Sequence, residues 1–188
     1  MEQTTLTDRE LLAALIGQRQ AERLYQGSLA SLLLKESGTG GGYGKLSAAK
    51  EIMRRALKEE LKKRTSINRP DKVRDYLRLV FAGKEREVFL LVLLDAHHRV
   101  IEAIELFLGT LNQANVYPRE VVKSALKYNA AGVIIAHNHP SGSAEPSSDD
   151  LATTMKLKQA LALIDVKVLD HFVVAGNECL SFAERGII

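Results

Sequence analysis

The chain has 188 residues and a formal net charge of +3, with 46% hydrophobic residues, 26% charged residues and one cysteine. This length allows one domain or a small domain joined to a medium one, and the composition excludes a disordered or collagen-like chain. The single cysteine excludes an internal disulfide and a cysteine-cage zinc site, so any metal must be bound by histidines and carboxylates.

The start of the chain is polar and acidic, and it lacks the basic and apolar regions of a signal peptide. No apolar run in the sequence approaches the roughly 20 residues needed to span a bilayer. We therefore expect a cytoplasmic protein without membrane contact.

The first 65 residues carry the basic excess of the chain. They hold 12 Lys and Arg against 8 Asp and Glu, whereas residues 66–188 hold 14 against 15. The excess is small and interspersed with acids, which favours a solvated helix face, although a basic segment also suits a nucleic-acid phosphate backbone. DNA contact through residues 1–65 is therefore a second interpretation.

Helices are predicted on both sides of a glycine-rich stretch. Residues 7–34 should form two short helices, because apolar residues follow the cap candidates Thr7 and Asp8 at helical spacing. Residues 37–45 contain five glycines in nine positions, which predicts a turn whose backbone takes positive φ or closely approaches another group. A charge-dense helix is expected over residues 47–64.

The Gly-Tyr-Gly-Lys sequence that ends this stretch resembles the loop of a helix-hairpin-helix, in which backbone N–H groups contact a DNA phosphate. A flexible turn between packed helices is the alternative. Leu46 follows Gly44 and Lys45 where a nucleotide-binding phosphate loop needs Ser or Thr, so such a loop is excluded.

A polar, proline-terminated segment at residues 65–70 predicts a linker. We expect a small all-α helical domain over residues 1–65 and an α/β domain over residues 66–188. The second domain should contain a helix, two strands, a helix, a strand, a helix and two strands, at residues 73–83, 88–95, 100–108, 118–129, 132–136, 149–163, 166–169 and 172–175. The continuous apolar run at 88–95 predicts a strand buried on both faces, within a mixed β-sheet flanked by helices.

Two histidines follow the third predicted strand. His137 and His139 are two residues apart, so on an extended strand end both imidazoles point to the same side. Asp150, at the start of the next helix, can fold back over the intervening loop as a third ligand. Three protein ligands and one open position are typical of a catalytic zinc site. His97 and His98 lack partners at ligand spacing and are interpreted as solvated turn residues.

The spacing of His137, His139, Ser147 and Asp150 is similar to the JAMM (MPN-plus) signature. The text H-N-H-P-S-G, followed by E-P-S and D, resembles the RadC branch of that superfamily over about residues 66–188. The segments ELLAALIG and GYGKLSAAK resemble a shortened form of the same family's N-terminal helix-hairpin-helix region. Most JAMM peptidases have Ser or Thr between the histidines, whereas this chain has Asn138, as the RadC branch does.

The resemblance implies a JAMM/MPN-plus, cytidine-deaminase-like fold with one Zn²⁺ per chain. His137, His139 and Asp150 would be the zinc ligands, Ser147 would stabilise a developing oxyanion, and Glu87 would be the general base, with Glu85 as the alternative. The implied activity is hydrolysis of an amide or isopeptide bond in a peptide or protein substrate.

Two other functions stay open. The chain could be a DNA-associated repair or recombination module whose zinc domain serves assembly, or a structural metal domain used for protein contacts. Asp170 and His171 lie between the last two predicted strands. They are interpreted as a structural pair, with orientation of a metal-binding histidine as the alternative.

Overall fold

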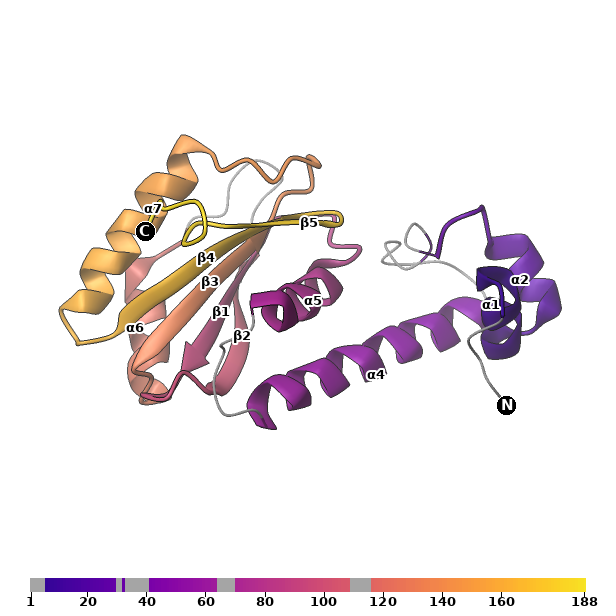
Figure 1. Ribbon diagram of the computed structural model, residues 1–188, viewed down its shortest axis with the longest axis horizontal. Coiled ribbons are helices and arrows are strands. Elements are labelled where there is room, and N and C mark those ends of the chain that lie inside the picture. The colour runs from indigo at the N-terminus through magenta and orange to yellow at the C-terminus, as the bar shows by residue number, and fades with distance from the viewer. Residues whose placement is uncertain (1–5, 30–31, 33–40, 64–69, 109–115) are drawn as a thin grey trace.

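The structure is a computed structural model that describes residues 6–29, 32, 41–63, 70–108 and 116–188 (Figure 1). Its helices and strands are α1 (Asp8–Ile16), α2 (Gln18–Leu24), α4 (Gly41–Lys63), α5 (Pro70–Phe81), β1 (Val88–Leu94), β2 (Val100–Leu108), α6 (Pro118–Lys127), β3 (Gly132–Asn138), α7 (Ser148–Ala162), β4 (Lys167–Ala175) and β5 (Glu178–Ser181). Among the helices in these ranges, none combines the length and apolarity that a membrane crossing requires.

The five strands form one mixed sheet in the order β2-β1-β3-β4-β5. Only β3 and β4 pair in parallel, and the other neighbours are antiparallel. Helix α5 covers one face of the sheet, and α6 and α7 cover the other (Figure 1). The predicted fold class, a mixed sheet flanked by helices and preceded by a helical region, is confirmed.

The continuous apolar run of β1 is explained by this double cover. Its side chains alternate between the two faces: Val88, Leu90, Val92 and Leu94 pack on the α5 side, and Phe89, Leu91 and Leu93 pack on the α6–α7 side. All seven residues are buried. Each such side chain contributes about 1.5–3 kcal/mol on burial, so β1 is fixed at the middle of the sheet next to β3.

The last two predicted strands are wrong in their limits. Residues 166–169 and 172–175 belong mainly to one strand, β4, and β5 was not predicted. The polar residue Asp170 suggested a break, but its carboxylate accepts hydrogen bonds from Ser181 Oγ at 2.6 Å and Ala183 N at 3.0 Å, so the strand continues through it. A bulge at Leu169, between Val168 and Asp170, shifts the register against β3.

The N-terminal helices begin as the sequence predicts, with Thr7 capping α1 through a reciprocal hydrogen-bond pair with Glu10. The predicted turn at 37–45 is wrong for its second half, because α4 already begins at Gly41, while residues 37–40 lie outside the described part. A Cβ at Gly42 would lie 3.3 Å from both Gln20 Cβ and Leu24 Cδ1. This is a tight contact, so glycine lets α4 and α2 approach closely here.

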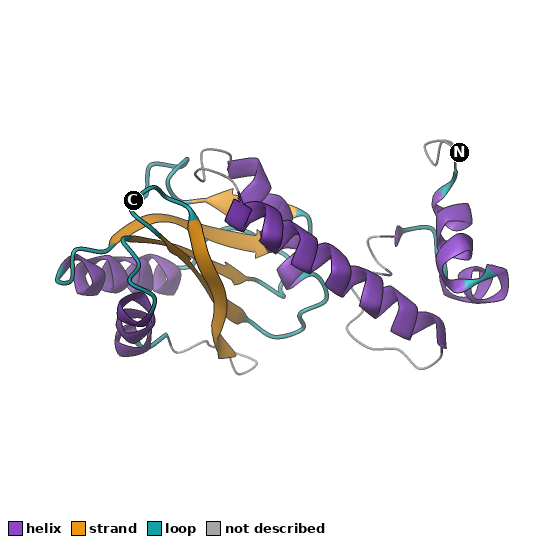
Figure 2. Ribbon diagram, turned by 90° about the horizontal axis from the view of Figure 1, so that it is seen from below, coloured by secondary structure: helices purple, strands orange, loops and turns teal. Residues whose placement is uncertain are grey.

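Helix α4 links the N-terminal helices to the sheet (Figure 2). Near its start, Leu46 packs with buried residues of α1 and α2. Further along, Leu57 packs against the α5-side core, and Lys58 and Lys62 pair with Glu102 on β2. Pro70, predicted to end a linker, is the first residue of α5, and residues 64–69 lie outside the described ranges. The domain division at residue 65 stays a prediction.

Candidate metal centre

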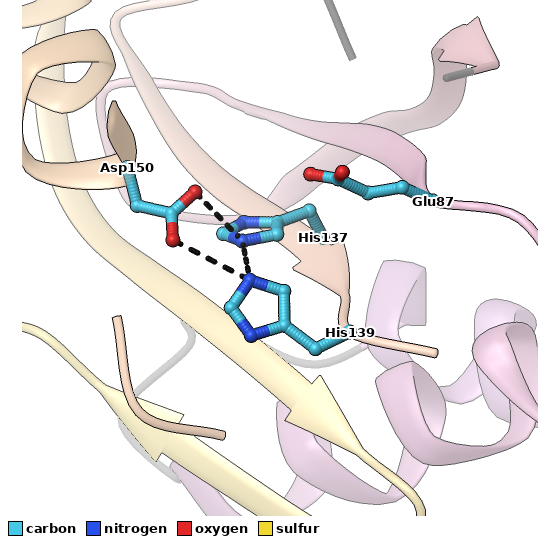
Figure 3. Close-up of side chains that lie close together, drawn as sticks. All are labelled: Glu87, His137, His139 and Asp150. Carbon is cyan, nitrogen blue, oxygen red and sulfur yellow. Dashed lines mark hydrogen bonds and ion pairs between the residues drawn. The ribbon is translucent and has the colours of Figure 1, made fainter. Parts of the chain in front are cut away.

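The two histidines lie at the end of β3, in the middle of the sheet. Strand β3 extends to Asn138, so His137 is a buried strand residue and His139 follows directly after the strand. Their imidazole centroids are 4.8 Å apart, and the two Nε2 atoms are separated by 3.0 Å (Figure 3). The predicted orientation of both rings to one side is what the structure has.

Asp150 completes the arrangement from the first turn of α7. Its Oδ1 lies 3.1 Å from His137 Nε2, and its Oδ2 lies 3.4 Å from His139 Nε2. Burial opposes ionisation of this carboxyl, but its interactions with the two histidines outweigh burial and hold the pKa of Asp150 far below its usual range. Two nitrogen atoms and one carboxylate therefore converge on one point.

The sequence places Asp150 by capping the helix that carries it. Ser147 is the N-cap of α7, and its Oγ accepts a hydrogen bond from Asp150 N at 3.1 Å. In return, Asp150 Oδ2 accepts hydrogen bonds from the Ser147 N–H and hydroxyl, both at 2.7 Å. The helix cap and the ligand are thus one structure, which fixes the carboxylate before any ion is present.

Glu87 joins the two histidines and Asp150, because one ligand atom from each of the four residues lies within 4.8 Å of the others. Its carboxylate is turned toward the imidazoles from the start of β1 (Figure 3). Glu85 is exposed and is not a member of this group. The four side chains form a group that could hold a metal ion in the position that the sequence indicated.

Asn138 holds the segment that carries Glu87. Its Oδ1 accepts a hydrogen bond from Val88 N at 2.8 Å, and its Nδ2 donates to Arg86 O at 3.0 Å. The side chain is 4% exposed. Because it lies between two histidines on an extended segment, its side chain points to the opposite face from theirs, where it contacts the residues that lead into β1. Sequence reasoning noted Asn138 only as a departure from Ser or Thr and missed this contact.

The donor atoms fit a zinc ion. For tetrahedral zinc with bonds of about 2.0–2.1 Å, neighbouring ligand atoms are about 3.3 Å apart. Here the two Nε2 atoms are 3.0 Å apart, and the two oxygens of Asp150 lie 3.1 Å from His137 Nε2 (Oδ1) and 3.4 Å from His139 Nε2 (Oδ2). His139 Nδ1 lies 2.8 Å from the carbonyl oxygen of Ser143, which can only accept a hydrogen bond. In the neutral imidazole the proton is therefore on Nδ1, and Nε2 has its lone pair free for an ion.

The group lines a cleft of about 390 Å³ between the sheet edge and α7. Ser147 and Asp149 also line it, and residues of α7 contribute to the lining as far as Leu157. A substrate therefore has access to the side chains of the group. The role of Ser147 toward an oxyanion stays a prediction. His97 and His98 are exposed in the turn between β1 and β2 and are not part of the group.

Basic residues that the sequence offered for DNA contact lie on α4. Arg54 and Arg55 both form ion pairs with Glu51, at 2.7 Å each, and Lys45 is exposed one turn into the helix. The Gly-Tyr-Gly-Lys residues are helical and do not form the loop that a helix-hairpin-helix would present. DNA contact through residues 1–65 stays a prediction.

A mixed β-sheet flanked by helices, with two histidines at the end of a central strand and an aspartate in the first turn of the next helix, is the arrangement of a JAB-type domain. Residues 67–187 match the RadC-like JAB domain family, and the chain belongs to the RadC family.

Relatives of high identity are found in several bacteria. The chain is 61% identical to a protein of Nitrosomonas eutropha over 78% of its own length and 65% of the relative, and 55% identical to one of Dechloromonas aromatica over 86% and 74%. It is 50% identical to a Methylibium petroleiphilum protein over 97% of its length and 90% of the relative. All three are named as UPF0758 proteins, a name that states no activity. The chain thus spans just under two thirds of the first of these relatives.

Proposed function

We propose that this protein is a zinc-dependent hydrolase of the JAMM metallopeptidase type, which cleaves an amide or isopeptide bond. The observation that carries the proposal is the convergence of His137 Nε2, His139 Nε2 and the Asp150 carboxylate beside Glu87 in an accessible cleft. Zinc, when bound there, supplies the Lewis acidity that makes water a nucleophile near neutral pH.

Glu87 is the proton carrier of the proposed reaction. Its carboxylate is close to the group, within 4.8 Å, yet it comes from a different element than the other three residues. This carboxylate accepts the proton of the attacking water and delivers it to the leaving amine, which typically accelerates a reaction by about 10²–10⁴-fold. Asn138 supports this role by fixing the backbone on both sides of Glu87.

Ser147 is proposed to donate a hydrogen bond to the developing oxyanion. Its hydroxyl now donates to Asp150 Oδ2 at 2.7 Å. The oxyanion role therefore requires the hydroxyl to rotate toward the substrate, while the backbone N–H of Ser147 keeps Asp150 in place. One such donor is worth about 3 kcal/mol in other enzymes.

The first experiment is elemental analysis of the purified protein and of Asp150→Ala. We expect one zinc per chain in the wild type and loss of zinc in the variant. Asp149→Ala is the matched control, because Asp149 is the neighbouring carboxylate in the cleft but is not part of the group. A folded wild type without metal, after incubation with zinc, would overturn the proposal.

The second experiment separates catalysis from metal binding. Glu87→Gln should keep zinc and lose turnover of peptide or isopeptide substrates by at least 10²-fold. Glu85→Gln, a neighbouring exposed glutamate, serves as the control and should turn over substrate like the wild type. Full activity in Glu87→Gln would rule out its role as the proton carrier.

A further inference from the structure

A second buried histidine contacts the metal centre from behind. His171 on β4 is 1% exposed, and its Nε2 lies 2.8 Å from His137 Nδ1, the ring nitrogen that faces away from the group. On its other side, His171 Nδ1 lies 2.6 Å from Thr154 Oγ1. Thr154, 1% exposed on α7, also lies 2.6 Å from the carbonyl oxygen of Asp150. The three side chains form a continuous buried chain of hydrogen bonds.

The direction of every hydrogen bond in this chain follows from the group at its end, the carbonyl oxygen of Asp150. The Asp150 carbonyl can only accept, so the hydroxyl of Thr154 donates to it. Thr154 Oγ1 then accepts from His171 Nδ1–H. His171 is 1% exposed, and an imidazolium without an ionised hydrogen-bond partner is costly to bury, so the ring is neutral and carries one N–H. His171 Nε2 therefore accepts from His137 Nδ1–H.

This order leaves His137 Nε2 without a proton, directed at the group formed with His139 and Asp150. The opposite tautomer of His137 would place an N–H in the metal position and two bare nitrogens against each other at 2.8 Å. Burial removes water as a partner for either ring. In the opposite tautomer Nε2–H would donate to Asp150 Oδ1 at 3.1 Å, so the bond with His171 competes with this carboxylate and favours the tautomer that can bind an ion.

The bulge in β4 explains why His171 can reach His137. The extra residue, Leu169, shifts the pairing so that His171 lies opposite Ile135 of β3, on the same face as His137 two residues later. A shift of one residue reverses the face to which each side chain points. Without the bulge, His171 would face α5 and the contact with His137 would be lost.

We propose that His171 and Thr154 are positioning residues that fix His137 as its Nδ1–H tautomer and so prepare Nε2 to bind the metal. The inference rests on the proposed metal site but not on hydrolysis. Asp150 then has two roles: its carboxylate binds the metal, and its backbone carbonyl accepts the hydrogen bond of Thr154 at the end of the chain.

The test compares Thr154→Val with Thr154→Ser. Valine keeps the shape of threonine and removes the hydroxyl, so His171 Nδ1–H loses its acceptor and the tautomer of His137 is no longer selected. Serine keeps the hydroxyl. We expect zinc affinity, measured by competition with a chromophoric chelator, to fall about 10–100-fold in Thr154→Val, and to stay within about threefold of the wild type in Thr154→Ser.

Nitrogen-15 NMR of the metal-free proteins provides the readout that a purely structural role would not change. The wild type and Thr154→Ser should give the shifts of an Nδ1–H tautomer at His137, and Thr154→Val should give those of a mixture. If Thr154→Val fails to fold, His171→Gln and His171→Phe replace the pair, since glutamine retains an acceptor for His137 and phenylalanine does not.

The outcomes separate this inference from the proposed function. Unchanged zinc affinity and tautomer in Thr154→Val, or equal affinity in His171→Gln and His171→Phe, would overturn it. A wild type that binds no zinc contradicts the proposed function, while the tautomer of metal-free His137 still decides whether the bond chain acts. Loss of affinity in Thr154→Val supports the inference even if no substrate is ever hydrolysed.

Discussion

Two regions of the molecule are stabilised in different ways: the end of the sheet that carries Glu87, His137 and His139 together with the start of α7, here called the metal edge, and the N-terminal helices. At the metal edge, polar groups at fixed positions bind one another: Asn138 binds the first residue of β1, and Ser147 binds Asp150. In the N-terminal helices, an apolar cluster holds α1, α2 and the start of α4 together, with Leu12, Ile16, Ala21, Leu24, Leu32 and Leu46 as its buried members. The stability of the metal edge depends on particular polar groups. The stability of the N-terminal helices depends on the volume of apolar side chains and on the close approach of the helices.

The largest effect is expected at the metal edge, in Asn138→Ala. This change leaves the buried N–H of Val88 without its acceptor and should lower the free energy of unfolding by about 1–3 kcal/mol, as measured by urea denaturation. Asn177→Ala, at an exposed asparagine, is the control and should stay within about 0.5 kcal/mol of the wild type. Equal stability of the two variants would show that the metal edge tolerates the loss of a specific polar group.

A smaller effect is expected where α4, the helix that leads from the N-terminal helices, packs on the sheet. Glu102 on β2 binds Lys58 and Lys62 of α4. Burial opposes its ionisation, but the hydrogen bonds from both lysines outweigh burial and lower the pKa of Glu102 from 4.5 to about 2. Because this pKa is lowered on folding, the stabilisation is fully present above pH 4.5 and is lost as the pH falls through 2.

Glu102→Gln should therefore lower the free energy of unfolding by roughly 1 kcal/mol at pH 7. The difference from the wild type should shrink as the pH is lowered from 4.5 toward 2. Urea denaturation of both proteins across this range measures it. The control is Glu105→Gln on the same strand, since Glu105 pairs with Lys84 at 3.5 Å and not with the two lysines of α4. A difference that does not change with pH would mean that the ion pairs do not hold α4 on the sheet.

The smallest effect is expected at two glycines of α4. A Cβ at Gly44 would meet nothing within 4 Å, so Gly44→Ala should stabilise the helix by about 0.5–1 kcal/mol. At Gly42 the same atom would contact Gln20 and Leu24 at 3.3 Å, which offsets the gain. The melting temperatures of Gly44→Ala and Gly42→Ala, measured by thermal unfolding, give this comparison. Equal stabilisation by both alanines would remove close approach as the reason for glycine at position 42.

The difference between the regions also explains which features could be predicted from the sequence. The spacing of His137, His139 and Asp150 depends on local geometry, since a strand end and a helix cap lie within one short stretch. The apolar run of β1 likewise indicates burial on both faces. These features do not depend on distant contacts, so the sequence was sufficient to predict them.

Features that depend on distant contacts were missed or, for His171, left as the less favoured alternative. Asp170 reads as a break in a strand until its partners Ser181 and Ala183 are known. The pairing of His171 with His137 spans 34 residues and depends on a bulge at Leu169. Gly42 reads as a turn residue until the side chains of α2 are in place. A single sequence carries no record of which distant residue each position meets.

The several contacts of Asp150 constrain how this protein can change over generations. Its amide, carboxylate and carbonyl all bind within the first turns of α7, to Ser147 and Thr154. A mutation at position 150 therefore removes, in a single step, the carboxylate that faces the two histidines and that accepts the Ser147 N–H and hydroxyl, while the backbone bonds to Ser147 Oγ and Thr154 remain. A descendant that replaces this carboxylate also gives up half of the capping box of α7, so loss of the metal-facing group carries a cost in local helix stability.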